Sequence, residues 1–362
     1  MYDLSVVVPT FNEKHNVQPL FEALCAALEG RSWQVIFVDD DSPDGTAEEA
    51  KSLAKNFDNV RVIHRVGRRG LAGACIEGIL SSTAPFSAVI DADLQHDETK
   101  LRPMLDTLER NDEFDIVIGS RRIDGGSSGD GLSHLRRWGS DRATSISKRM
   151  LGITASDPMS GFFMVRRRSF NKVVASLENS GFKILADMLA ASGGQWRTTE
   201  IPYTFRPRHA GESKMDLAVT LEFLSLVIAR STGRLISPRF VLFCIVGFTG
   251  VFIQLIAVKF ALAFLTGSFT IAQLFGVSLA MLSNFLLNNR ITYRDRTLTG
   301  RAFRDGILSF YVVCVLGAIM NVAVAELVFS SLPVWAVASI SGAIAGALWN
   351  FVASSTYTWR SR

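Results

Sequence analysis

The hydrophobic residues in the first half of the chain form short β-rich runs, and the segments between these runs have helical spacing. Strands and helices that alternate in this way predict a mostly parallel sheet with helices on both faces, an α/β fold. The predicted strands are 4–8, 35–38, 60–63, 87–90 and 116–118. The predicted helices between them are 16–28, 46–54 and 70–80.

The pattern changes after Pro238, where apolar residues continue almost without interruption and the acidic residues are Asp295, Asp305 and Glu326. Four apolar stretches there are each close to the roughly 20 residues that cross a bilayer as a helix. They lie at about 240–262, 270–289, 307–330 and 334–355. An earlier apolar segment, 217–229, is too short to cross, and we expect an amphipathic helix at the membrane surface or, alternatively, a buried core helix.

Arginines gather before the first apolar stretch, between the second and third, and after the fourth. The other two connections hold no Lys or Arg apart from Lys259, at the end of the first stretch. Because positive charge favours the cytoplasmic side, both ends of the chain and its first half are predicted to be cytoplasmic. The protein is therefore expected to be a multi-pass protein of the cell membrane.

The overall charge is mildly basic, with 38 Lys and Arg against 34 Asp and Glu. No basic face with interleaved aromatic residues is evident, so nucleic acid is not an expected partner. Phosphorylated substrates and the lipid bilayer explain the basic clusters better. The four cysteines have no CxxC spacing and are expected to be small buried residues in a reducing compartment.

The membrane half contains an internal repeat. Asn284-Phe285 is followed by Thr292-Tyr293-Arg294, and Asn350-Phe351 is followed at the same spacing by Thr358-Trp359-Arg360. Each half of this region is thus predicted to be a helical hairpin that ends in the same motif. An Asn within a membrane is costly and usually faces other helices, so the pair serves either packing or the handling of a lipid or sugar.

Clusters of carboxylates follow two of the predicted strands. Asp91-Ala92-Asp93 comes after the fourth strand, and Asp39-Asp40-Asp41 ends the second. Ligands of such sheets bind beyond the carboxyl ends of the strands. Two aspartates one residue apart suit Mg²⁺ or Mn²⁺, which share their coordination with substrate phosphates. The three adjacent aspartates could receive hydrogen bonds from a nucleobase or ribose, although Pro43-Asp44-Gly45 also predicts a simple turn.

Six motifs, taken in order, carry a resemblance to a known family. They are Pro-Thr-Phe-Asn-Glu at 9–13, Val-Asp-Asp at 38–40, Gly-Leu-Ala-Gly-Ala at 70–74, Asp-Ala-Asp-Leu-Gln-His at 91–96, Gly-Ser-Arg at 119–121 and Ser-Asp-Pro-Met-Ser-Gly-Phe at 156–162. Over roughly residues 3–216 the chain resembles family-two glycosyltransferases of the GT-A fold, and most closely the dolichol- or polyprenol-phosphate mannose synthases. The membrane half resembles GtrA-like four-helix domains.

The resemblance implies an architecture of three parts. These are a Rossmann-like GT-A domain with a mostly parallel sheet at 1–216, a juxtamembrane helix at 217–237 and an α-helical domain with four transmembrane helices at 238–362.

The resemblance also implies a role for each motif residue. The nucleotide site would be lined by Pro9, Phe11, Glu13, Asp39, Asp40 and Asp91. Mg²⁺ or Mn²⁺ would be held by Asp91, Asp93 and Gln95. The acceptor phosphate would be bound by Arg121, Arg136, Ser140, Arg206, Ser213 and Lys214. The catalytic set would be Asp93, Arg121 and Asp157, where Asp157 either acts near the sugar or orders the turn at Ser160-Gly161.

The expected reaction transfers a hexose, mannose from GDP-mannose, to a polyprenyl (dolichyl) phosphate with inversion at the cytoplasmic membrane face. A phosphate acceptor is already anionic, so it needs arginines for positioning more than a base for deprotonation. UDP-glucose is the alternative donor, because related enzymes share nearly every motif. Asp41, where the family more often has Asn, leaves the base open.

In a second functional class, the GtrA-like half would act as a flippase for the lipid-linked sugar. A processive polysaccharide synthase is disfavoured, because the Gln-x-x-Arg-Trp motif typical of those enzymes is missing from the sequence. The sequence leaves the oligomeric state open, including a homo-oligomer.

Overall fold

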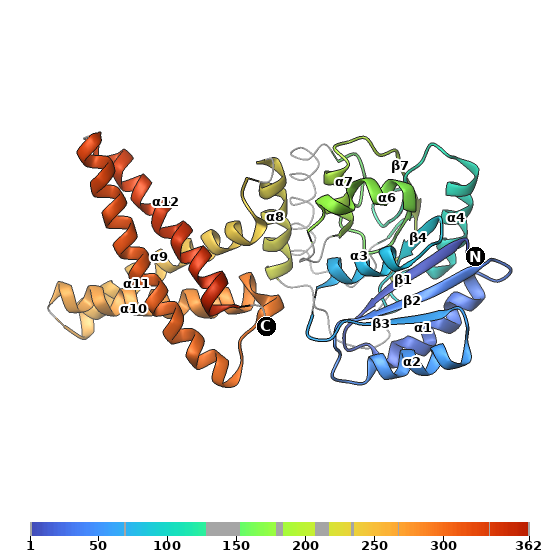
Figure 1. Cartoon of the computed structure of the whole chain (residues 1–362), viewed down its shortest axis with the longest axis horizontal. Coiled ribbons are helices and arrows are strands. Elements are labelled where there is room, and N and C mark those ends of the chain that lie inside the picture. The colour runs from blue at the N-terminus through green and yellow to red at the C-terminus, as the bar shows by residue number, and fades with distance from the viewer. Residues whose placement is uncertain are drawn as a thin grey trace. The chain divides into compact units, whose positions relative to one another are not determined.

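The structure is a computed structural model that describes residues 2–68, 70–127, 153–178, 184–206, 217–232, 235–266, 268–332 and 334–360. The chain divides into two compact units, Met1–Gly233 and Arg234–Arg362. The first unit contains a twisted sheet between helices, and the second consists of long helices (Figure 1).

Seven strands of the described chain form one sheet in the order β3-β2-β1-β4-β6-β5-β7. The strand β6 is antiparallel to both of its neighbours, and the other neighbouring pairs are parallel. The strands are β1 (Leu4–Thr10), β2 (Trp33–Asp39), β3 (Val60–His64), β4 (Phe86–Val89), β5 (Ile116–Ser120), β6 (Phe163–Arg166) and β7 (Thr198–Pro202).

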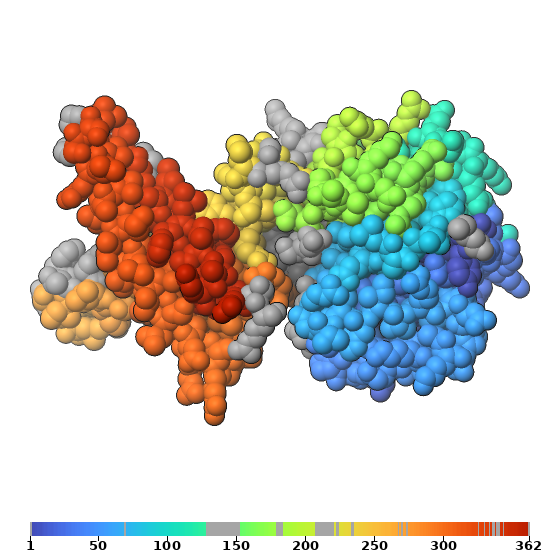
Figure 2. Space-filling model, viewed as in Figure 1, coloured from blue at the N-terminus to red at the C-terminus, as the bar shows by residue number. Residues whose placement is uncertain are grey.

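Side chains that alternate along the strands build a separate core on each face of the sheet. From β1, Val6 and Val8 face a core shared with α1, α2 and α4, whereas Val7 faces a core shared with α3, α6 and α7. In Figure 2 the green atoms of α6 and α7 lie directly against the light-blue atoms of α3. The helices are α1 (Lys14–Ala27), α2 (Thr46–Asn56), α3 (Leu71–Ser81), α4 (Leu101–Arg110), α6 (Arg167–Val173) and α7 (Ile184–Ala191), with short 3₁₀ turns at Glu98–Lys100 and Val174–Ser176.

The predicted α/β class is confirmed, and the five predicted strands and three predicted helices appear within a few residues of their expected ends. The strands β6 and β7 were not predicted. β6 has only four residues, and β7 is a half-buried strand at the sheet edge that carries two threonines, a glutamate and a terminal proline. Edge strands tolerate such residues, so they lack the apolar pattern that marks a central strand.

The helix α8 (Leu217–Ser231) belongs to the first unit. The Arg230 guanidinium donates to Asp187 Oδ1 on α7 at 2.8 Å and to the carbonyl of Ser176 at 2.6 Å. Val227 packs against Ala186 of α7 and against Met159. A buried ion pair and an apolar contact thus join α8 to the sheet domain, while its position at a membrane surface and the boundaries at 216 and 237 remain predictions.

The second unit contains four long helices where the sequence predicts four apolar stretches. They are α9 (Pro238–Phe264), α10 (Phe269–Leu287), α11 (Gly300–Ser331) and α12 (Trp335–Ala353). Within the part of the chain that the structure describes, 238–264 and 300–328 are long and apolar enough to cross a membrane. The pairs α9–α10 and α11–α12 each pack side by side as a hairpin.

The two hairpins end in the same way. A π-helical turn follows each, at Asn288–Thr292 and at Ser354–Thr358. The aromatic residues that come next, Tyr293 and Trp359, stack with ring centroids 4.2 Å apart and planes 5° from parallel. The repeated sequence motif therefore corresponds to a repeated local structure, and its two copies meet in one aromatic stack.

The repeated asparagines pack against glycines in their own hairpins. Asn284 Oδ1 and Asn350 Oδ1 are buried and accept no hydrogen bond. A Cβ placed on Gly250 of α9 would lie 2.5 Å from Asn284 Oδ1, and one on Gly317 of α11 would overlap Asn350 Oδ1. Each asparagine amide thus packs against the backbone of a glycine, whose Cα–H group can donate a weak hydrogen bond. The contact favours the packing interpretation of these asparagines.

We predict that Gly250→Ala and Gly317→Ala each destabilise the second unit, because the new methyl group overlaps the amide of Asn284 or Asn350. Overpacking of this kind costs about 1–3 kcal/mol. Thermal unfolding of the detergent-solubilised chain should show a lower Tm for both variants. Gly247→Ala is the matched control, since a Cβ there has open space around it in the same helix. An equal Tm for Gly247→Ala and Gly250→Ala would contradict the proposed packing.

Candidate active site

The candidate site lies at one edge of the sheet, where the carboxyl ends of the parallel strands meet. Asp39 ends β2, Asp91 follows β4 and Arg121 follows β5. The antiparallel strand β6 starts at this same edge, because its first residue, Phe163, pairs with Val89 and Ile118 near the ends of β4 and β5. The loop before β6 therefore brings Asp157 to the same edge as the strand-end residues.

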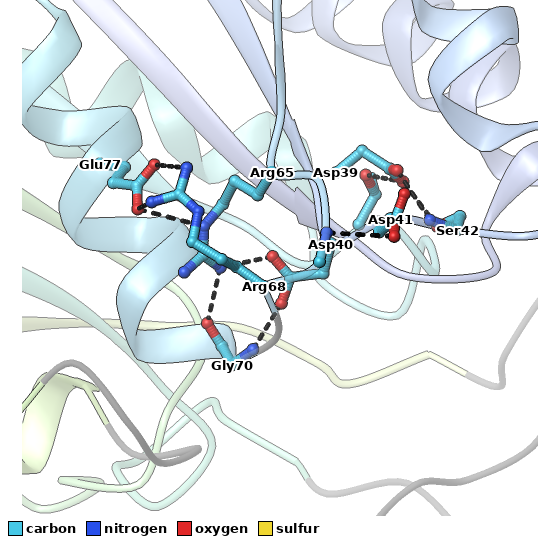
Figure 3. A network of polar contacts seen from close by, with 10 residues as sticks. Asp39, Asp40, Asp41, Ser42, Arg65, Arg68, Gly70 and Glu77 are labelled. Carbon is cyan, nitrogen blue, oxygen red and sulfur yellow. Dashed lines mark hydrogen bonds and ion pairs between the residues drawn. The ribbon is translucent and has the colours of Figure 1, made fainter. Parts of the chain in front are cut away.

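Each of the three adjacent aspartates has its own partners within the protein. Figure 3 shows those of Asp39 and Asp40. Asp39 is fully buried and accepts hydrogen bonds from Ser42 Oγ at 2.6 Å and Thr10 Oγ1 at 3.1 Å. Asp41 adopts a left-handed backbone conformation, with φ of 58°, and contacts His64 Nε2 at 3.1 Å. Protein groups, without any ligand, thus already offset the repulsion among these carboxylates.

Asp40 is held by the segment that enters α3. Its carboxylate binds the Arg65 guanidinium and accepts from the backbone N–H of Gly70 at 2.6 Å. Arg65 is itself buried, and Glu77 of α3 joins it to Arg68, as the sticks in Figure 3 show. Burial raises the pKa of Asp40 above its ordinary value, although the charge of Arg65 and the Gly70 hydrogen bond act in the opposite direction.

The two motif aspartates after β4 have different surroundings. The Asp93 side chain is buried, and its Oδ1 accepts from the backbone N–H of Gln95 at 3.2 Å. Asp91 is partly exposed, and its Oδ2 lies 3.1 Å from His96 Nε2. A Cβ on Gly161 would lie 2.8 Å from that same Asp91 oxygen, so glycine at this position makes room for the carboxylate.

This pair fits a divalent cation that shares its ligands with a substrate. No group of three or more His, Cys, Asp or Glu suited to a metal occurs in the described ranges. Mg²⁺ and Mn²⁺ commonly bind one or two carboxylates and complete their coordination with phosphate oxygens and water. Asp91 and Asp93, with the amide of Gln95 nearby, offer oxygen ligands of that kind.

Gln95 links the motif to the segment after β7. Its Nε2 donates to the Arg206 carbonyl at 3.1 Å, and the Arg206 N–H donates to the Gln95 carbonyl at 2.8 Å. The Arg206 guanidinium binds Glu98 Oε2 at 2.8 Å and Asp97 Oδ1 at 2.9 Å. The structure thus places Arg206 against two carboxylates beside the motif, and its binding of an acceptor phosphate remains a prediction.

Arg121 and Asp157 form a bidentate, largely buried ion pair. Arg121 Nε donates to Asp157 Oδ2 at 2.8 Å, and a terminal nitrogen donates to Oδ1 at 3.1 Å. Burial alone would raise the pKa of Asp157, but the hydrogen bond and charge of Arg121 hold it below its ordinary value. Burial alone would lower the pKa of Arg121, and Asp157 raises it. Both groups are therefore charged at neutral pH.

Asp157 also has a role in the turn. Its carbonyl accepts from the N–H of Ser160 at 3.2 Å, and Ser160 Oγ donates to the Gly119 carbonyl at 2.7 Å. The backbone of Asp157 thus orders the Ser160-Gly161 turn, while its carboxylate orients Arg121. A role next to the sugar remains a prediction.

The other predicted residues are placed as follows. Pro9 lies in β1, Phe11 is half-buried after it, and Glu13 directly precedes α1, where Glu13 Oε2 accepts from Asn16 Nδ2 at 2.7 Å. The predicted residues Arg136, Ser140, Ser213 and Lys214 lie outside the described residues.

The structure brings three further residues into the site: Arg65 and Tyr203, which sequence analysis missed, and His96, to which it gave no role. Arg65 directly follows β3, and its backbone N–H donates to the Asp39 carbonyl at 2.8 Å. His96 is the last residue of the motif at 91–96, and this position is its signal in the sequence. Tyr203 reaches His96 from 107 positions away, and no local pattern indicates that contact.

Known proteins match both halves of the chain. Residues 5–174 match the family Glycosyl transferase family 2, and residues 242–359 match the GtrA/DPMS, transmembrane domain. A dolichol-phosphate mannosyltransferase of Pyrococcus furiosus is 33% identical over 322 residues, which cover 88% of this chain and 88% of that protein. The chain belongs to this family of glycosyltransferases. The predicted enzyme class is thereby confirmed, as is a membrane domain of the GtrA-like type.

Two further similarities are more partial. A dolichol-phosphate mannosyltransferase of Saccharomyces cerevisiae is 32% identical over 61% of this glycosyltransferase and 84% of the yeast protein. The solved structure of glucosyl-3-phosphoglycerate synthase from Mycobacterium tuberculosis, in complex with Mn²⁺, UDP-glucose and phosphoglyceric acid, has a TM-score of 0.48 and 17% identity, over 64% of this chain and 80% of that one.

We predict that Asp157→Asn loosens the strand-end site, because it leaves the Arg121 charge buried without its counterion. Breaking a buried ion pair costs about 3–5 kcal/mol. Hydrogen exchange of amides in 116–121 and 157–166 should be faster in this variant of the full chain. Glu113→Gln is the control, since its ion pair with Arg197 is exposed and such pairs contribute about 0–1 kcal/mol.

The destabilisation caused by Asp157→Asn should decrease as the pH falls. The folded-state pKa of Asp157 lies below its unfolded value of about 3.9, so its stabilisation is present at neutral pH. The stabilisation is lost as the pH falls below about 4 and through the folded-state pKa. The difference between the wild-type chain and Asp157→Asn should therefore shrink in acid, and a difference that grows in acid would contradict this account.

Proposed function

We propose that this glycosyltransferase transfers mannose from GDP-mannose to a polyprenyl (dolichyl) phosphate, with inversion, at the cytoplasmic face of the membrane. One observation carries the proposal: Asp91 and Asp93 lie at the same sheet edge as the Arg121–Asp157 pair. A cation on the aspartates would hold the donor diphosphate at the edge where Arg121 could receive the acceptor phosphate. The Pyrococcus furiosus and Saccharomyces cerevisiae relatives, both dolichol-phosphate mannosyltransferases, support this choice of substrates.

The proposed reaction is a direct displacement. An oxygen of the acceptor phosphate forms a bond to the anomeric carbon of mannose, while the bond from that carbon to the diphosphate breaks and GDP leaves with the electron pair. Attack from the face opposite the leaving group inverts the configuration. The acceptor oxygen is already anionic, so the chain needs no general base, and orientation of the two phosphates supplies the catalysis.

Arg121 would orient the acceptor phosphate. Asp157 uses both carboxylate oxygens to hold one edge of the guanidinium, which fixes the plane of the group. The side chain also lies over the Phe205 ring, 5.3 Å from its centroid. A guanidinium restrained in this way can present its other N–H groups to an anion with little loss of side-chain entropy.

Mg²⁺ or Mn²⁺ would supply the charge that stabilises GDP as it leaves. Asp91, Asp93 and Gln95 are the residues that would hold this ion. Asp39, Asp40, Pro9, Phe11 and Glu13 would line the nucleoside site. The protein contacts of Asp39 and Asp40 hold their carboxylates in fixed positions. The nucleoside would therefore bind against a preorganised surface at the end of β2.

The cytoplasmic orientation rests on the arginines that flank the predicted spans. Arg239 at the start of α9 binds Asp295 Oδ2 at 2.8 Å in the connection between α10 and α11. The beginning of one hairpin and the end of its second helix thus lie on the same side of this unit. This connection itself holds three arginines, Arg290, Arg294 and Arg296, which favours its placement in the cytoplasm.

We expect purified protein with Mn²⁺, polyprenyl phosphate and labelled GDP-mannose to produce labelled lipid. Asp93→Ala should lower the rate by about 10²–10³-fold, as loss of a group that stabilises leaving-group charge does. Asp112→Ala is the matched control, because that aspartate is 80% exposed on the surface of the same unit. The measurement is label in the lipid fraction, with UDP-glucose tested in parallel.

The outcomes separate the alternatives. Label from UDP-glucose instead of GDP-mannose would replace the donor and keep the reaction class. No lipid label from any donor, in protein whose unfolding is that of a folded chain, would contradict the proposed function.

A further inference from the structure

His96 is a buried histidine beside the predicted metal ligands, and its two ring nitrogens have different partners. The residue is 3% exposed. Nε2 lies 3.1 Å from Asp91 Oδ2, and Nδ1 lies 2.8 Å from the hydroxyl of Tyr203, a residue that is 1% exposed. A continuous hydrogen-bonded chain thus runs from the tyrosine through the imidazole to the carboxylate.

The imidazole is clamped by aromatic rings. The centroids of Phe162, Tyr203 and Phe205 lie 5.5, 5.6 and 5.5 Å from that of His96. Phe162 directly precedes β6, and Tyr203 and Phe205 follow β7, so two separate parts of the fold hold the ring in place. These aromatic contacts therefore restrain the rotation of the imidazole that contacts Asp91.

Gly161 lies next to the Asp91–His96 contact. A Cβ at this position would lie 2.8 Å from Asp91 Oδ2 and 3.3 Å from His96 Nε2. The contact thus lies beside the same turn whose first residue, Asp157, orients Arg121.

An imidazole that is protonated on Nε2 satisfies both hydrogen bonds at once. Burial raises the pKa of Tyr203, so its hydroxyl retains its proton and can donate to Nδ1. With Nδ1 as the acceptor of that bond, the imidazole carries its proton on Nε2 and can donate it to Asp91 Oδ2. The opposite tautomer would place an unprotonated nitrogen against a carboxylate oxygen at 3.1 Å, which is repulsive.

We propose that His96, held by Tyr203, is a positioning residue that fixes the Asp91 carboxylate for a divalent cation and the donor diphosphate. The hydrogen bond from the imidazole to Oδ2 would fix the orientation in which the Asp91 carboxylate meets the ion. The inference rests on the metal role of Asp91 in the proposed function. Partners that orient metal ligands in this way contribute about 10–100-fold to metal affinity or activity.

The test measures Mn²⁺ binding by the full chain in detergent with GDP present, by electron paramagnetic resonance of free Mn²⁺. His96→Phe keeps a ring in the aromatic clamp but removes the donor, and should weaken Mn²⁺ binding by about 10–100-fold. His96→Gln places an amide N–H near the position of Nε2 and should restore most of the affinity. Tyr203→Phe removes only the hydroxyl and should give a smaller loss in the same direction.

Three controls make the result specific. Asp91→Ala should abolish the binding that the His96 variants weaken, and His15→Gln, at an exposed histidine, should leave it unchanged. In the lipid-labelling assay, the Mn²⁺ concentration for half-maximal rate and the KM for GDP-mannose should rise in His96→Phe, while the KM for polyprenyl phosphate stays constant. A purely structural defect would instead lower Tm and change all three constants together.

Equal Mn²⁺ affinity in the wild-type chain, His96→Phe and Tyr203→Phe would overturn the inference, as would failure of His96→Gln to recover affinity lost in His96→Phe. The same titration with UDP in place of GDP separates this inference from the choice of donor. Binding that requires UDP but still depends on His96 would contradict GDP-mannose as donor and support the role of His96.

Discussion

The site depends on the reversed direction of one short strand. Since β6 runs antiparallel between β4 and β5, the turn that leads into it lies at the edge where Asp91 and Arg121 leave their strands. Two hydrogen bonds fasten this turn to β5, from the Gly119 N–H to the Phe162 carbonyl at 2.9 Å and from Ser160 Oγ to the Gly119 carbonyl at 2.7 Å. In parallel orientation, the same turn would lie at the opposite edge of the sheet, and Asp157 and Gly161 could not contact the strand-end residues.

Buried charges in the first unit have a positioning role more than a stabilising one. Asp40 with Arg65, Asp157 with Arg121 and Asp187 with Arg230 are ion pairs in which the carboxylate also accepts a backbone N–H. Desolvation offsets much of the attraction in such pairs, so their net contribution to stability is small, whereas loss of one partner is costly. Each pair joins segments distant in sequence. The first two lie at the strand-end edge, and the third joins α8 to α7.

The sequence predicts most of the sheet because its central strands must be apolar on both faces. Val6, Val7 and Val8 illustrate this, since consecutive residues enter opposite cores. It predicts the aspartate motifs because these directly follow such strands. It does not reveal the site's internal partners: Tyr203 contacts His96 across 107 positions and Arg65 contacts Asp40 across 25, and neither contact leaves a local periodic signal. A short strand such as β6 is missed for the same reason, because its position is determined by hydrogen bonds to β4 and β5.

In the membrane unit, polar side chains lie among apolar helices. A transport path needs polar side chains that face a cavity or one another. Asn284 Oδ1 and Asn350 Oδ1 instead rest on the backbone of Gly250 and Gly317, each within its own hairpin. The aromatic residues of the two copies, Tyr293 and Trp359, stack on each other. The Trp359 indole N–H donates to Asn289 Oδ1 at 3.0 Å, and the Tyr293 hydroxyl lies 2.9 Å from Ser355 Oγ. Each aromatic residue is thus bound to the π-helical turn of the other hairpin. Such reciprocal contacts hold the two hairpin ends together, so packing accounts for the repeated residues, while a flippase role of this unit stays a prediction.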